Sequence, residues 1–333
     1  MRLVVAPDKF KGAANARAAA SAMARGARRA GWLAEEVPLA DGGEGTLDAF
    51  GGANRILMVS GPLGDPVEAG WRLDGDLAVI EMARASGLAL AGGKAGNDPL
   101  RATTKGTGEL LLAAIASGAR RVIVGVGGSA TTDGGAGALE VLGTASFAAR
   151  GVTVEVACDV ETRFRDAARV FGPQKGADPE AVVMLEARLV DLAERYQERF
   201  GVALEEVPHS GAAGGLAGGL FALGARLCSG FDLIAEAVGL DRALDGASLV
   251  LTGEGRFDST SLQGKVVGGV AHHAELQGIK LLVVAGVVAE EVQGALPAIS
   301  LVERYGSARA LAQTTACLEE VVEEWLILHS PSG

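Results

Sequence analysis

One stretch, residues 121–137, constrains the fold more than any other: its sequence is RVIVGVGGSATTDGGAG. The apolar run at its start is typical of a buried strand, and the residues that follow Gly137 are typical of a helix. A strand, a glycine-rich turn and a helix in this order commonly form an anion site, because glycine lets backbone N–H groups approach a phosphate and a helix N-terminus offers unpaired donors. We therefore predict that this turn binds a ligand. The alternative is a tight crossover that binds nothing.

Length and charge limit the classes of function. With 333 residues the chain is long for one hydrophobic core, so we expect two domains. The net charge of −11 argues against a nucleic-acid partner, which would require a basic face. The sequence has no apolar run long enough to span a bilayer, and Pro7 and Asp8 follow the first strand too early for a signal peptide. The three cysteines are scattered and show no pairing pattern, which suits a reducing compartment. We therefore predict a soluble, cytoplasmic protein without a membrane partner.

Strands and helices alternate at both ends of the chain, which indicates a parallel sheet. The expected strands are 3–6, 36–39, 248–252, 280–285 and 299–302, and the expected helices are 14–30, 263–277 and 308–328. The middle of the chain differs, because short extended pieces and turns over residues 56–82 predict an antiparallel meander. After it we expect helices over 103–117, 179–200 and 211–224 and a strand over 152–156. We predict an α/β fold with two domains: an open parallel-sheet domain from residues 1–58 and 230–333, and an inserted mixed α/β domain from residues 59–229.

Familiar nucleotide motifs do not fit well. Residues 125–130 match the G-x-G-x-x-A pattern of dinucleotide-binding folds, but the acidic residue expected about 20 positions later is missing. The nearest acidic residue at a strand end, Asp159, lies too far along the chain, and Gly134-Gly135 interrupts the turn. No P-loop motif is present, and the four histidines have no zinc spacing.

Carboxylates recur beside glycines. Asp41 precedes Gly42 and Gly43, Asp133 precedes Gly134 and Gly135, and Glu254 lies between two glycines. Asp8 and Asp159 also follow strands. Carboxylates at such places can bind Mg²⁺ or accept a hydroxyl proton, so together with the glycine-rich turn they favour phosphoryl transfer.

Cations near strand ends complete the set of candidates. Lys11 follows the first strand, Lys175 lies in a Gly-Pro turn, and Arg256 follows a later strand. These residues could hold anionic groups of a substrate, although each could also be an ordinary surface cation.

Six segments together resemble the bacterial glycerate kinase family. They are VAPDKFKG from Val5, ADGGEGT from Ala40, TKGTGE from Thr104, GGSATTDGG from Gly127, FGPQKG from Phe171 and TGEGRFD from Thr252. The resemblance implies ATP-dependent phosphorylation of D-glycerate, at the 2-hydroxyl, with Mg²⁺. It also implies that the discontinuous domain is flavodoxin-like.

From the residues and the resemblance we expect the following assignments. The catalytic group is Asp8, Lys11, Asp41 and Asp133. Substrate or phosphate would contact Gly42, Gly43, Glu44, Gly127, Gly128, Ser129, Gly134, Gly135, Lys175, Glu254 and Arg256. The metal ligands would be Asp41, Asp159 and Glu254. The sequence does not decide which aspartate is the base, and we expect the site in an interdomain cleft, with a homodimer possible.

Two alternatives remain open at this point. One is a catalytically weak protein that binds glycerate or nucleotide, and the other is a kinase that forms 3-phosphoglycerate. Two departures from the family pattern bear on them: a shorter connector over residues 143–154 and an altered segment over residues 160–170.

Overall fold

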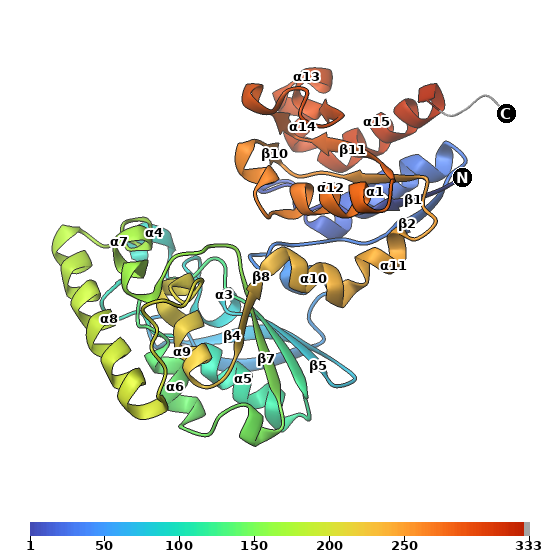
Figure 1. Ribbon diagram of the computed structural model, residues 1–333. Helices are drawn as coiled ribbons and strands as arrows, with labels where there is room; N and C mark the ends of the chain where they lie inside the picture. The colour runs from blue at the N-terminus through green and yellow to red at the C-terminus, as the bar shows by residue number, and fades with distance from the viewer. Residues whose placement is uncertain (330–333) are drawn as a thin grey trace. The chain divides into compact units, whose positions relative to one another are not determined.

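The computed structural model describes residues 1–329, which divide into two compact units (Figure 1). The first unit comprises Met1–Asp41, Asp48–Gly51 and the described chain from Phe231 on, and the second comprises Gly42–Leu47 and Gly52–Gly230. The short segment Gly42–Leu47 thus groups with the second unit although its neighbours in sequence belong to the first. The domain boundaries given above remain a prediction.

The first unit is built on a five-stranded parallel sheet. Its strands lie in the order β13 (Ala298–Ser300), β11 (Lys280–Ala285), β9 (Leu249–Thr252), β1 (Arg2–Val5) and β2 (Leu33–Glu36). Numbered along the chain within this sheet and read from the β2 edge, the order is 2-1-3-4-5, which is the order of flavodoxin-like folds. The α/β prediction with a parallel-sheet domain is therefore confirmed.

Helices cover both faces of this sheet because successive strand residues point to opposite sides. Leu3 and Val5 face α1 (Ala16–Arg29) and α15 (Thr314–His329), whereas Val4 belongs to the core formed with α10 (Gly230–Val238), α11 (Leu240–Leu244) and α12 (Val266–Leu276). Two further strands, β10 (Arg256–Phe257) and β12 (Val287–Val288), pair in parallel beyond β9 and β11. The remaining helices are α13 (Leu301–Tyr305) and α14 (Ser307–Ala312).

The second unit contains a six-stranded mixed sheet. The strands β3 (Arg55–Ser60), β4 (Pro66–Asp74) and β5 (Leu77–Glu81) form the predicted antiparallel meander. The strands β6 (Arg121–Gly125), β7 (Thr153–Cys158) and β8 (Arg226–Ser229) continue from β5 in parallel. The longer helices are α5 (Lys105–Ala116), α6 (Ala136–Leu142), α8 (Pro179–Phe200) and α9 (Leu216–Ala222), and the short ones are α3 (Ala83–Ser86), α4 (Gly93–Gly96) and α7 (Ala167–Phe171). The short helix α2 (Thr46–Ala49) has two residues in each unit.

The helix α8 has the predicted bounds. Asp178 caps its first turn by accepting the N–H of Ala181 at 2.8 Å, and Gly201 ends it in the left-handed conformation.

Three other predictions need correction. The second strand ends at Glu36 rather than beginning there, since the polar edge strand β2 lacks the apolar run that suggested 36–39. The segment 211–224 is broken at Ala213, whose φ is +54°. The last helix is divided at Gln313, whose φ and ψ are −130° and 38°.

Candidate functional site

Three carboxylates lie at the carboxyl ends of strands in the first unit. Asp8 follows β1, Asp41 follows the loop after β2, and Glu254 follows β9. The Asp8 N–H donates to the Gly253 carbonyl at 2.8 Å, which joins the loops after β1 and β9. The Nζ of Lys9 lies 3.7 Å from Asp8 Oδ1 and 3.9 Å from Asp41 Oδ1. The structure thus gathers two predicted carboxylates around Lys9.

Burial makes two of these carboxylates unusually basic. It raises the pKa of Asp8 to about 6, with Lys9 opposing the shift and Asp41 adding to it. It raises the pKa of Glu254 to about 7, with a further contribution from the charge of Asp8. Glu254 Oε1 is buried without a hydrogen-bond partner among the described residues. Carboxyl groups that titrate near neutrality are suited to proton transfer, and an unpartnered buried oxygen is available to a ligand.

The predicted cations of this unit are exposed. Lys11 is exposed within the Phe10–Ala14 turn. The Arg256 side chain is 61% exposed and its Nε is 3.4 Å from Asp258 Oδ2. Both could reach an anionic group from the surface, and their predicted roles are not tested by these contacts.

In the second unit, the loop Gly42–Leu47 packs against the ends of β6 and β7. The Gly127 N–H donates to the Gly42 carbonyl at 3.3 Å, and a Cβ on Gly127 would come within 2.5 Å of the Gly43 Cα. Gly42 has a φ of +89°, and a Cβ there would lie 2.6 Å from the Ala157 carbonyl oxygen. Only glycine allows this approach of backbone to backbone, so the two glycine-rich motifs noted in the sequence are in direct contact.

One buried carboxylate holds this loop. Glu81, at the end of β5, accepts the N–H groups of Gly45 at 2.9 Å and Leu47 at 2.8 Å through Oε1. Its Oε2 lies 3.0 Å from Arg84 Nε. Glu81 is 3% exposed. The sequence analysis missed it, although an acidic residue that ends an apolar strand was a signal it could have used.

The amides of the glycine-rich turn are partly occupied within the protein. Gly134 donates to the Gly214 carbonyl at 3.0 Å, and Gly135 donates to Asp133 Oδ1 at 3.1 Å. In the part of the chain described here, the amides of Gly128 and Ser129 have no such acceptor. The expectation of an anion-binding turn therefore rests mainly on these last two amides.

Asp133 is surrounded by donors. Its Oδ2 accepts from the Thr104 N–H and the Thr104 hydroxyl, both at 2.8 Å, and from the Gly137 N–H at 3.2 Å. With Gly135 on Oδ1, this carboxylate ties the first turn of α6 to the start of α5. Asp133 is 7% exposed. These contacts describe a structural link, and the predicted catalytic role of Asp133 stays a prediction.

Lys175 lies behind the same turn rather than on the surface. Its side chain is buried, its Nζ donates to the Thr131 carbonyl at 2.6 Å, and it lies 6.0 Å from the centre of the Phe171 ring. Burial lowers the pKa of Lys175 to about 7, and the charge of Asp133 acts in the opposite direction. A substrate anion could reach this ammonium only if the turn moved.

The predicted metal ligands do not form a preformed cluster. Across residues 1–329 no group of three or more Asp, Glu, His and Cys side chains is arranged to hold a metal ion. Asp41 and Glu254 lie in the first unit, and Asp159 is exposed after β7 in the second. The candidate residues thus fall into two groups, one of carboxylates in the first unit and one around the glycine-rich turn in the second.

Within residues 1–329, no helix combines the length and apolar character needed to cross a membrane.

Comparison with known proteins identifies the family. Residues 3–152 and 146–328 match the model of the glycerate kinase family. The glycerate 2-kinase of Escherichia coli (strain K12) is 40% identical over 331 residues, which cover 88% of this chain and 87% of that protein. The glycerate kinase of Halalkalibacterium halodurans is 37% identical over 373 residues, covering 98% of each chain. A crystal structure of a candidate glycerate kinase 2 from Salmonella typhimurium LT2 has a TM-score of 0.86 at 33% identity and covers 98% of both chains. The resemblance noted in the sequence is therefore confirmed, and the chain belongs to the glycerate kinase family.

Proposed function

We propose that this protein transfers the γ-phosphoryl group of ATP to the 2-hydroxyl of D-glycerate and forms 2-phosphoglycerate. The observation that carries the proposal is the group of Asp8, Asp41 and Glu254 at the carboxyl ends of parallel strands, with Lys9 between the first two. In open α/β sheets, ligands bind at this edge. The names of the relatives supply the substrate class and the position of phosphorylation.

In this proposal Asp8 is the general base. A pKa of about 6 leaves Asp8 ionised at neutral pH and still basic enough to accept the substrate hydroxyl proton. As the proton moves to Asp8, the hydroxyl oxygen attacks the γ-phosphorus, the bond from that phosphorus to the β–γ bridging oxygen breaks, and ADP leaves. Lys9 limits the negative charge that Asp8 and Asp41 bring to the site. We expect Asp8→Asn to lower turnover at least 100-fold, within the range of about 10²–10⁴ typical of a positioned base.

The donor set is suited to Mg²⁺ carried by ATP. Mg²⁺ usually takes one or two protein carboxylates together with phosphate oxygens and water, so a cluster of three ligands is not required. The best candidates in the first unit are the unpartnered Oε1 of Glu254 and the carboxylate of Asp41, whose Oδ1 lies 3.9 Å from Lys9 Nζ. Bound there, Mg²⁺ would neutralise charge on the transferred phosphoryl group. EDTA should abolish turnover, and added Mg²⁺ should restore it.

The glycine-rich group would serve the same reaction. We assign the amides of Gly128 and Ser129 to an anionic group of substrate or nucleotide, since both belong to a turn that follows the buried strand β6. The loop Gly42–Leu47 abuts that turn, which supports a shared task for Glu44 and its neighbours. Action across an interdomain cleft, a cytoplasmic location and a homodimer remain predictions from the sequence.

The decisive experiment is ³¹P NMR of the products of ATP and D-glycerate, with Asp8→Asn as the control enzyme. We expect ADP and 2-phosphoglycerate. Formation of 3-phosphoglycerate would instead support the alternative kinase, and tight glycerate binding without turnover would support the binding protein.

A further inference from the structure

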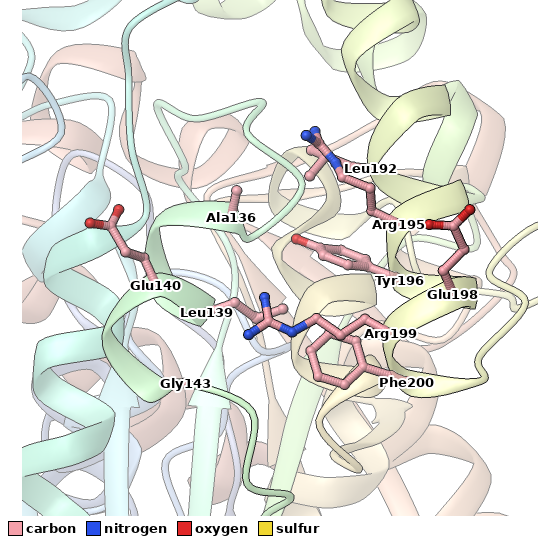
Figure 2. A pocket seen from close by; sticks show the side chains of 10 residues that line it. All are labelled: Ala136, Leu139, Glu140, Gly143, Leu192, Arg195, Tyr196, Glu198, Arg199 and Phe200. Carbon is pink, nitrogen blue, oxygen red and sulfur yellow. The ribbon is translucent and has the colours of Figure 1, made fainter.

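A hollow between α6 and α8 lies behind the glycine-rich turn. Figure 2 shows it with the side chains that line it, and its volume is about 800 Å³. Leu139 on α6 and Leu192 and Phe200 on α8 supply apolar walls. Small-molecule sites are typically hollows of roughly 300–1,000 Å³ with apolar walls and a few polar groups. The size and lining therefore suit a small organic ligand.

The polar groups of the hollow favour an anion. Arg195 and Arg199 lie one turn apart on α8, and no carboxylate of residues 1–329 lies within ion-pair distance of either. Figure 2 shows the Arg199 guanidinium extending toward Leu139, whereas Glu140 and Glu198 point away from the hollow. A guanidinium matches a carboxylate or phosphate because it donates two parallel N–H bonds.

The ring of Phe200 adds a second point of recognition. The Arg199 guanidinium carbon lies 5.5 Å from the centre of that ring. A planar, apolar body could pack on the exposed part of the ring and on the leucines while its anionic group contacts the arginines. The hollow thus combines apolar walls with cationic groups.

Tyr196 connects the hollow to the turn. It lines the hollow, and its hydroxyl donates to the Gly134 carbonyl at 3.1 Å. Leu192 also touches the turn, because a Cβ on Gly134 would lie 2.7 Å from Leu192 Cδ1. A ligand in the hollow would contact the side chains that support Gly134.

We propose that this hollow is a binding site for a small organic anion with a planar apolar body, separate from the carboxylate group of the first unit. Arg195 and Arg199 bind the anionic group, and Leu139, Leu192 and Phe200 bind the body. This assignment does not depend on the identity of the phosphoryl acceptor.

The test is calorimetric titration of the full-length protein with phenyl phosphate and, separately, with benzyl alcohol. We expect one phenyl phosphate per chain, and at least tenfold weaker binding of benzyl alcohol. The double variant Arg195→Gln/Arg199→Gln should bind phenyl phosphate at least tenfold more weakly. The matched control Arg17→Gln/Arg101→Gln makes the same change in net charge at exposed positions elsewhere and should bind like the parent protein.

Three outcomes would overturn the assignment. They are no saturable binding of phenyl phosphate, equal binding by the Arg195/Arg199 variant, and equal affinity for benzyl alcohol. Circular dichroism of each variant establishes that it is folded, and a nuclear magnetic resonance titration adds a local readout. Phenyl phosphate should shift the Gly134 amide resonance in the parent protein and leave it in place in the Arg195/Arg199 variant.

Discussion

Glu254 should limit the stability of the first unit in a pH-dependent manner. Burial raises its pKa from 4.5 to about 7, and each pKa unit corresponds to about 1.4 kcal/mol, so the ionised side chain costs the folded protein about 3 kcal/mol. Because the folded pKa exceeds the unfolded one, the stabilising contribution is complete below pH 4.5 and is lost as the pH rises through 7. Glu254→Gln removes this titration. The variant should gain up to about 3 kcal/mol over the parent protein at pH 8 and almost nothing at pH 4.

Urea unfolding at several pH values between 4 and 8 measures this difference. Trp32 and Trp325 lie in the first unit with Glu254, and Trp71 lies in the second. A Trp71→Phe background therefore restricts the fluorescence signal to the first unit. Glu275→Gln, at an exposed position on α12, is the matched control and should show no such pH-dependent gain. A Glu254→Gln effect that is constant with pH, or a loss of stability at pH 8, would refute the argument from burial.

Three further predictions concern the second unit. Asp133→Asn should lower the free energy of unfolding by about 2–4 kcal/mol, because it leaves buried N–H and O–H donors without an acceptor, and Thr104→Val by only about 1 kcal/mol. A stable Asp133→Asn protein with turnover reduced at least tenfold would show instead that Asp133 is catalytic. Lys175 has a folded pKa of about 7 against 10.5 unfolded, so the stability of the parent protein relative to Lys175→Met should rise between pH 7 and 10 in chemical denaturation; an unchanged difference would contradict this. Glu81→Ala should reduce kcat/KM at least tenfold by releasing its loop, while Arg84→Ala, which removes a half-exposed partner, should change it less than threefold; equal effects would argue against loop positioning.

Much of the architecture was predictable because it follows from local patterns. The alternation of apolar strands with capped helices predicted the parallel sheet, and Asp178, Pro179 and Gly201 predicted the bounds of α8. The failures arose where tertiary contacts decide. The strand β2 is polar and half exposed, so it has no apolar pattern that would predict it. Backbone pairing with β1 holds it in the sheet. The helical spacing of apolar residues in the last segment continues past Gln313. The helix nevertheless breaks at this residue, and no proline or glycine in the sequence indicates the break.

The candidate site shows the same division. The positions of Asp8 and Glu254 at strand ends were predictable, because parallel strands bring their carboxyl ends to one edge. Their raised pKa values were not, since these depend on burial by residues distant in sequence. The contacts of Asp133 and the burial of Lys175 could not be predicted either. A charged residue beside glycines has the same sequence pattern whether it faces a substrate or the protein interior.

The altered segment over residues 160–170 gives the glycine-rich turn its support. Phe164 is fully buried and makes an edge-on contact with Tyr196 at 6.0 Å between ring centres. A Cβ on Gly134 would lie 2.9 Å from Phe164 Cζ, and a Cβ on Gly218 would lie 2.4 Å from Phe164 Cδ2. The ring therefore fills the space that glycines at these positions leave, and the Tyr196 hydroxyl holds the Gly134 carbonyl from the same side. Since an aromatic ring and a hydrogen bond both fix this peptide, the altered segment supports the turn and does not by itself argue for a catalytically weak protein.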